Sequence, residues 1–108
     1  AILATVDADG VPNIIYVGDL QYQPDIGFVV ADNYFSKTRH NLEQGKTKGA
    51  LLFLTKDGKA YQVKGTLAYH TEGPVYDAMK QWHNQDHPGV GAAVIAVEDV
   101  FSGADKLN

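Results

Sequence analysis

Cysteine is absent from this sequence, so a disulfide framework, a thiolate metal site and a cysteine nucleophile are excluded. Long apolar runs are absent as well. The longest, Ala50–Leu54 and Ala92–Val97, are far too short to cross a bilayer as helices. No stretch combines the basic start and the apolar segment of a signal peptide. We therefore expect a cytoplasmic protein that has no membrane as a partner.

Positive charge is scarce too. Nine Lys and Arg residues stand against 13 Asp and Glu residues, which gives a formal net charge of −4. Proteins that bind nucleic acids are usually basic, so no nucleic-acid partner is expected. The 108 residues fit one domain spanning residues 1–108, and the hydrophobic content of 44% is enough for one core. Because the chain starts without Met, in a strand-like segment, we expect an upstream segment in the natural protein.

Most of the chain consists of short segments rich in β-branched and aromatic residues, separated by turn residues. The polar stretch from Gly18 to Pro24 is predicted as a turn. Gly65 lies inside the longest predicted strand, where a glycine often marks a bulge or a bend. Many short strands with turns between them favour a closed or partly closed barrel over a parallel sheet. The predicted strands cover residues 2–6, 13–17, 26–31, 49–55, 60–70 and 91–97.

Two short helices interrupt the strands. Ser36–Gln44 is the first, with Ser36 suited to the N-cap and Gly45 to the position just past the end. The second begins at Pro74, because proline is well tolerated at the first helical position. Its apolar residues recur at helical spacing. The fold class is therefore mainly β with two short helices. The residues that form the apolar face of this second helix are Val75, Met79 and Trp82.

The start of the first helix is unusual in its charge. The first turn of a helix carries a partial positive charge and normally attracts acids, but here it contains Lys37, Arg39 and His40. A bound phosphate would compensate these cations and would accept hydrogen bonds from the hydroxyls of Ser36 and Thr38. The alternative is a solvated basic helix start in which Ser36 is only a cap. The spacing alone leaves both interpretations open, and His40 can face a phosphate or solvent in either.

Two histidines, His83 and His87, stand four residues apart and could in principle place two metal ligands on one helical face. Pro88 follows directly and disfavours helical geometry at His87. We therefore predict two surface histidines in a loop, and no metal site. Trp82 is predicted as an anchor of the core or of a dimer interface.

The order of these segments is similar to that of a known group of proteins. An Asp-Gly turn, a Pro-Asn strand, a strand that ends in Asp32-Asn33, and a helix that begins Ser36-Lys37-Thr38 follow one another. Gln62-Val63-Lys64-Gly65 and Thr71-Glu72-Gly73-Pro74 continue the match over nearly the whole chain. This order resembles the pyridoxamine 5′-phosphate oxidase-like FMN-binding split-barrel families, particularly their small flavin-nucleotide-binding members. The resemblance implies a six-stranded antiparallel split β-barrel, FMN as cofactor, and a homodimer with the flavin at the interface.

The resemblance also implies which residues contact the flavin. The segment Ser36-Lys37-Thr38 would hold the phosphate, and Asp32 and Asn33 would lie beside the ribityl chain. The strand that contains Tyr16 would lie along the isoalloxazine ring and offer backbone groups to its polar edge. The cofactor-binding residues implied are Ile15, Tyr16, Val17, Asp32, Asn33, Ser36, Lys37, Thr38, Asn41 and Gln62.

Two departures argue against vitamin B6 chemistry itself. The oxidase carries a C-terminal portion with basic and aromatic residues, whereas this chain stops at Asn108. The oxidase also has an arginine-rich start to its flavin-binding strand, where this chain has Pro12-Asn13-Ile14. We therefore expect an FMN-dependent oxidoreductase that acts on an unidentified small substrate. The alternatives are a non-catalytic FMN-binding or electron-transfer protein, and a split barrel that uses a deazaflavin or haem.

Overall fold

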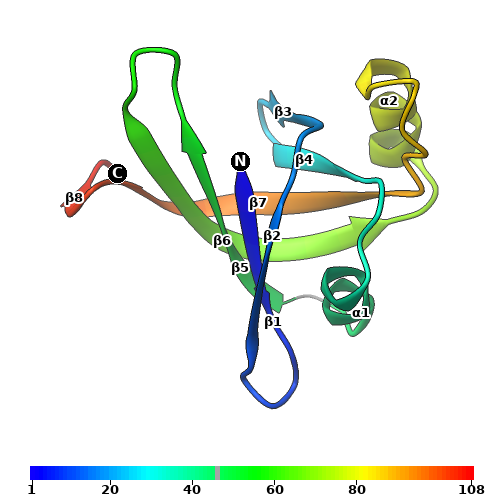
Figure 1. Ribbon diagram of the computed structural model, residues 1–108, viewed down its shortest axis with the longest axis horizontal. Helices are drawn as coiled ribbons and strands as arrows, with labels where there is room; N and C mark the ends of the chain where they lie inside the picture. Colours follow the sequence, from blue (N-terminus) through cyan, green and yellow to red (C-terminus); the bar gives the residue numbers. More distant parts are fainter. Residues whose placement is uncertain (46) are drawn as a thin grey trace.

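A computed structural model describes residues 1–45 and 47–108 and shows one large antiparallel sheet with two helices packed against it (Figure 1). The elements in chain order are β1 (Ile2–Val6), β2 (Pro12–Tyr16), β3 (Leu20–Gln23), β4 (Gly27–Asp32), α1 (Lys37–Glu43), β5 (Thr47–Leu54), β6 (Ala60–His70), α2 (Pro74–Trp82), β7 (Gly91–Ser102) and β8 (Asp105–Lys106). The prediction of a mainly β fold with two short helices is confirmed. Neither described helix has the length and apolar character that a membrane crossing requires.

The sheet has eight strands where six were predicted. Its main path runs β2-β1-β5-β6-β7-β4-β3, and β8 pairs with β7. Among the described residues no ladder joins β2 to β3, so the sheet has two free edges and the predicted barrel closure is not confirmed. The prediction of a turn from Gly18 to Pro24 is wrong, because Leu20–Gln23 forms β3. Its alternation of Leu, Gln, Tyr and Gln is a strand signal, but it is short and bounded by Gly18 and Pro24.

The longest ladder bends at Gly65, as predicted. The register between β6 and β7 shifts between Lys64 and Gly65, which marks a bulge. A Cβ atom added at Gly65 would lie 1.8 Å from the carbonyl oxygen of Ala96, so no larger residue fits there without movement of the backbone. The bend lets the sheet curve around its core, which α1 partly covers.

The core lies in two clusters on opposite faces of the sheet. The larger cluster covers one face and includes Leu42 of α1. The smaller cluster packs α2 against β4 and β7, with Met79 fully buried at its centre. Strand β4 serves both clusters because successive side chains of a strand point to opposite faces: Val29 and Ala31 face α2, whereas Val30 faces the larger cluster. The predicted apolar face of α2 is confirmed, and Trp82 packs at the edge of the smaller cluster.

Candidate functional site

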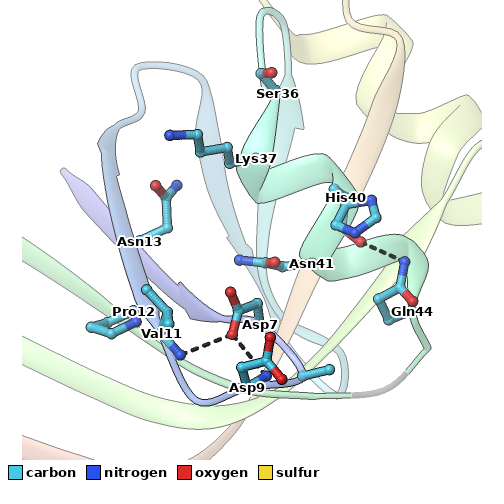
Figure 2. Close-up of a pocket in the computed structure, with 11 residues that line it drawn as sticks. Asp7, Asp9, Val11, Pro12, Asn13, Ser36, Lys37, His40, Asn41 and Gln44 are labelled. Atoms are coloured by element: carbon cyan, nitrogen blue, oxygen red, sulfur yellow. Dashed lines mark hydrogen bonds between the residues drawn. The ribbon is translucent and has the colours of Figure 1, made fainter.

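A polar cavity of about 460 Å³ lies between the β1–β2 hairpin and α1 (Figure 2). The hairpin turn is fixed by Asp7, whose Oδ1 atom accepts hydrogen bonds from the backbone N–H groups of Asp9 and Val11, each at 2.9 Å. Helix α1 forms the facing wall. The sequence therefore predicts the helix start correctly but not what lies across from it. The lining residues are Asp7, Ala8, Asp9, Val11, Pro12, Asn13, Ser36, Lys37, His40, Asn41 and Gln44.

Charges of both signs line this cavity. Lys37 and His40 come from α1, and Asp7 and Asp9 come from the hairpin turn. Figure 2 shows Lys37 toward one end and the two aspartates toward the other. Sequence reasoning missed the aspartates because an Asp-rich stretch before Gly10 is fully explained as a turn. Only the packing of α1 against the hairpin brings them to the same cavity as Lys37.

Ser36 occupies the predicted N-cap position of α1, but its hydroxyl makes no capping hydrogen bond. This side chain is exposed and lines the polar cavity, so its hydroxyl can reach a bound molecule there. Thr38 behaves differently. It is fully buried, and its hydroxyl oxygen accepts a hydrogen bond of 2.9 Å from the amide nitrogen of Asn13. This bond holds the start of α1 against β2.

Asn41, one turn further along α1, both lines the cavity and supports it. Its amide nitrogen donates to the hydroxyl oxygen of Thr5 on β1, at 2.9 Å, and its side chain is buried. The Asn41–Thr5 contact and the contact between Thr38 and Asn13 therefore fix α1 on the hairpin. The structure brings Ser36, Lys37 and Asn41 to one cavity.

Asp32 does not line this cavity, and its fully buried carboxylate forms an ion pair with Arg39. Its two carboxylate oxygens accept hydrogen bonds from Arg39 at 2.6 and 2.9 Å, from the Tyr69 hydroxyl at 2.5 Å and from the Phe35 N–H at 2.9 Å. Four donors match the acceptor capacity of a carboxylate, so no oxygen is left for a ligand. Burial by itself raises the pKa of Asp32, but the hydrogen bonds from Arg39, Tyr69 and Phe35 bring it below its ordinary value.

The contact with Asp32 also shifts the pKa values of Arg39 and Tyr69. Hydrogen bonding to Asp32 raises the pKa of Arg39 above its ordinary value. Burial and the negative charge of Asp32 raise the pKa of the Tyr69 hydroxyl, which stays protonated and donates. One of the three cations at the helix start is therefore compensated inside the protein. The argument for a bound anion then rests on Lys37 and His40.

Asn33 belongs to a second polar network, which joins three loops. Its amide nitrogen donates to Asp19 at 2.9 Å, and its amide oxygen accepts from the Gly89 N–H at 3.0 Å. The Nδ1 atom of His87 lies 2.8 Å from the same Asp19 oxygen. Burial opposes ionisation of Asp19, but hydrogen bonds from His87 and Asn33 lower its pKa overall. This network fixes the end of β4 relative to the segment after α2.

The prediction of two surface histidines is wrong for His83. Helix α2 ends at Trp82, and His83 turns inward, where its ring contacts the carbonyl oxygens of Met79 at 3.2 Å and His87 at 3.0 Å. Buried polar groups need such partners, and here the chain reversal after α2 supplies them. Among residues 1–45 and 47–108, no group of three or more potential metal-ligating side chains occurs.

An apolar cavity of about 640 Å³ opens beside the other end of β2. Tyr16 lines it with an 87% exposed side chain, whereas Ile15 and Val17 pack into the larger core cluster. Gln62 pairs with Leu52 in the β5–β6 ladder and lines neither this cavity nor the polar one. The lining residues are Ala1, Ile2, Tyr16, Leu20, Phe28, Leu52, Phe53, Leu54 and Ala60.

Strand β2 connects the two cavities and is an edge strand of the described sheet. Asn13 lines the polar cavity and Tyr16 lines the apolar one, about 10 Å apart at the usual rise of a strand. The N–H of Val17 donates to the carbonyl oxygen of Ala1 at 2.9 Å, toward β1. Because backbone groups alternate along a strand, those of Ile14 and Tyr16 point to the free edge. A planar molecule with polar groups along one side could hydrogen-bond there.

The fold and these cavities define a small antiparallel-sheet domain with an extended surface site along one edge strand. The sequence profile of the pyridoxamine 5′-phosphate oxidases matches residues 1–102. The chain therefore belongs to the pyridoxamine 5′-phosphate oxidase family, and this part of the resemblance is confirmed. No curated protein sequence matches the chain.

Several solved structures are similar over nearly the whole chain. The crystal structure of HupZ from group A Streptococcus is 34% identical, covers 99% of this chain and 86% of its own, and gives a TM-score of 0.78. A candidate pyridoxamine 5′-phosphate oxidase from Lactobacillus delbrueckii is 22% identical, with 94% and 82% coverage and a TM-score of 0.76. An FMN-binding protein from Syntrophomonas wolfei is 20% identical, with 99% and 78% coverage and a TM-score of 0.66. The last two similarities show the fold.

Proposed function

We propose that this protein binds a flavin along β2, with FMN as the family's typical form and the polar cavity as the phosphate end of the site. The observation that carries the proposal is the position of β2, an edge strand that runs from a polar cavity to an apolar one. FMN has the same division, with a phosphate at one end and a mostly apolar ring system at the other. Membership of the family and the fold shared with an FMN-binding protein support it.

The residues present fit the two ends of this cofactor. In the polar cavity, the ammonium group of Lys37 and the uncommitted hydroxyl of Ser36 would hold the phosphate, with Asn41 beside them. At the other end, the apolar cavity would take the isoalloxazine ring, and the free backbone groups of Ile14 and Tyr16 would reach its polar edge. The side chains of Ile15 and Val17 anchor β2 in the core, so their contribution is through the backbone.

Other residues implied by the resemblance act here as supports. Asp32 holds Arg39 and the Phe35 N–H and thereby positions the chain that leads into α1. Thr38 ties α1 to β2 through its bond with Asn13. Asn33 orders the adjacent loop through Asp19. A direct contact between Gln62 and the ring stays a prediction from the resemblance.

For the chemistry, we propose a flavin-dependent oxidoreductase that acts on a small molecule. A bound flavin supplies hydride and electron transfer, so the chain needs only to position it and to shield it from water. Within the part of the chain that the structure describes, Tyr16 contributes the one polar side chain to the apolar cavity. Its hydroxyl can donate to a substrate that lies over the ring. The apolar lining formed by Phe28, Phe53 and Leu52 limits the access of water.

We also propose that two copies of the chain form a homodimer that encloses the flavin. Ile14, Tyr16, Leu52 and Leu54 are 68%, 87%, 43% and 72% exposed, although three have large apolar side chains and the fourth has a large aromatic ring. The pairing of Ile2 with both Tyr16 and Leu52 places these side chains on one face of the sheet. An exposed apolar patch of this kind commonly marks an interface. A second copy would cover the apolar cavity, which is open in the single chain.

The proposal is tested by adding flavin to the purified protein. A visible absorption spectrum as purified, followed by titration of FMN with detection of its fluorescence, should show saturable binding and a perturbed flavin spectrum. A Tyr16→Ala variant tests the ring end, and Tyr22→Ala is its control, because Tyr22 is an exposed tyrosine that lines neither cavity. The absence of any spectral or fluorescence change at high micromolar FMN would refute flavin binding.

A further inference from the structure

The polar cavity is lined by acidic as well as basic side chains. Lys37 and His40 stand on one wall, and Asp7 and Asp9 stand on the other. One oxygen of Asp7 is used in the hairpin turn, but the carboxylate keeps its full negative charge. A phosphate monoester brings about 1.5 to 2 further negative charges at pH 7. Its attraction to Lys37 would therefore be offset in part by repulsion from the two carboxylates that line the same cavity.

Apart from the uncommitted Ser36 hydroxyl, the remaining side chains near the helix start contact protein partners. The guanidinium of Arg39 forms a bidentate pair with Asp32, which compensates its charge inside the protein, and Arg39 does not line the polar cavity. Thr38 is fully buried and accepts its hydrogen bond from Asn13. The contact between β2 and α1 is therefore a hydrogen bond between two uncharged side chains, Asn13 and Thr38. Helix α1 has only seven residues, so its dipole adds little.

The two ends of the site should therefore contribute unequally to the free energy of flavin binding. The apolar cavity, of about 640 Å³, is larger than the polar one and is lined by side chains that favour a flat apolar ring. Most of the free energy of binding would come from removing that ring from water and from its contacts with the edge of β2. The phosphate would leave a strongly hydrated state and find Lys37 and the Ser36 hydroxyl toward one end of the cavity and two aspartates toward the other.

We infer that this site recognises its flavin by the ring and discriminates only weakly between FMN and unphosphorylated riboflavin, with Asp7 and Asp9 as the residues that reduce the preference for the phosphate. This inference rests on the proposed flavin binding and specifies its ligand class: flavins with or without a 5′-phosphate. Asp7 and Asp9 act here on selectivity, because they set the charge that an incoming phosphate meets.

The test compares the dissociation constants of FMN and riboflavin, measured by fluorescence titration at one fixed salt concentration. For the unmodified chain we expect the two constants to agree within about tenfold, which corresponds to about 1.4 kcal/mol. Replacement of both aspartates, in a D7N/D9N variant, should tighten FMN binding about fivefold to tenfold and leave riboflavin unchanged. Asparagine at position 7 retains the Oδ1 acceptor on which the turn depends.

Two controls separate local from general charge effects. Asp105→Asn changes the net charge at an exposed residue outside the cavity and should alter neither constant. Lys37→Ala should weaken FMN severalfold and bring its constant to that of riboflavin. A circular dichroism spectrum like that of the unmodified chain verifies the fold of each variant.

Each remaining outcome contradicts a defined part of the proposal. If the unmodified chain binds FMN a hundredfold or more tighter than riboflavin, the inference is wrong while flavin binding stands. If D7N/D9N shifts both ligands equally, the aspartates do not act on the phosphate, and the inference is wrong as well. If neither flavin binds to any variant, the proposed function fails together with the inference.

Discussion

Asp32 and Arg39 form a bidentate ion pair, with N–O distances of 2.6 and 2.9 Å, in which the carboxylate is fully buried. The pair joins the end of β4 to α1, seven residues later in the chain. Tyr69 of β6 donates to the same carboxylate at 2.5 Å. One buried charge thus fixes three elements whose relative positions shape the polar cavity, although it does not line that cavity itself.

Removal of Arg39 should destabilise the fold. In an Arg39→Ala variant, Asp32 would keep two hydrogen bonds but lose its countercharge in a buried position. We expect a loss of about 2–3 kcal/mol in the free energy of unfolding, the range for a charged hydrogen bond that leaves a buried partner. Urea denaturation followed by circular dichroism measures it. Lys37→Ala, an exposed lysine two residues away, is the matched control and should change stability little. Equal effects of the two substitutions would show that the ion pair contributes nothing specific.

The same pair predicts the acid limb of the stability profile. The pKa of Asp32 is lowered in the folded protein, so its contribution to stability is present above its ordinary pKa of 3.8. That contribution is lost as the pH falls below about 4 and toward the folded-state pKa. The unfolding free energy should therefore decrease steeply on acidification, and this slope should be reduced in Asp32→Asn. Identical slopes for the two proteins between pH 5 and 2, measured by urea titration, would exclude Asp32 as a major contributor.

At alkaline pH the free energy of unfolding should decrease as the pH rises, and Tyr69 determines this dependence. Burial and the charge of Asp32 raise the pKa of this phenol above its ordinary value of 10.0. Its contribution is therefore present below pH 10 and decreases as the pH rises beyond it. Tyr69→Phe keeps the ring and removes the hydroxyl, so it should lose stability at neutral pH by about 1.5–3 kcal/mol. It should also lose less stability than the unmodified chain between pH 10 and 11. Parallel profiles of the two proteins in that range would contradict this assignment.

Gly65 is expected to tolerate no side chain. Its missing Cβ would lie 1.8 Å from a backbone oxygen of β7, so Gly65→Ala forces the two longest strands apart. Overpacking of this kind costs about 1–3 kcal/mol or more, and thermal unfolding should show a clearly lower Tm. Gly18→Ala is the matched control, because no atom lies within 4 Å of its added Cβ and its φ is not positive. A Tm for Gly65→Ala equal to that of Gly18→Ala would mean that the strands can separate freely at the bulge.

The sequence predicts single elements better than it predicts contacts between them. The bulge at Gly65 and the apolar face of α2 follow from spacing within one segment, and both are confirmed. The ion pair of Asp32 and Arg39 was not predicted, because helical spacing says nothing about the direction in which a strand-end carboxylate turns. The inward position of His83 was missed for a similar reason, since the backbone carbonyls that bind it come from a chain reversal.

The candidate site shows the same limit. Ser36 and Lys37 could be grouped from their positions at the start of α1, and Asn41 from the family resemblance, and the structure brings all three to one cavity. Asp7 and Asp9 reach that cavity only through the docking of the helix on the hairpin. The charge of the cavity, which decides what it can bind, therefore comes from a long-range contact that local sequence patterns do not encode.

The proposed dimer gives the last prediction. Leu54 is 72% exposed on the apolar face that we assign to the partner, so Leu54→Lys should place a charge in the interface at little cost to the single chain. Sedimentation velocity should show a dimer for the unmodified protein and a monomer for the variant. Leu107→Lys is the control, because Leu107 is 53% exposed but lies near the C-terminus, outside this face. Flavin affinity should fall together with the dimer in Leu54→Lys, since a second copy would cover the ring. A monomeric unmodified protein that binds flavin tightly would refute the shared site and leave the flavin along β2 of a single chain.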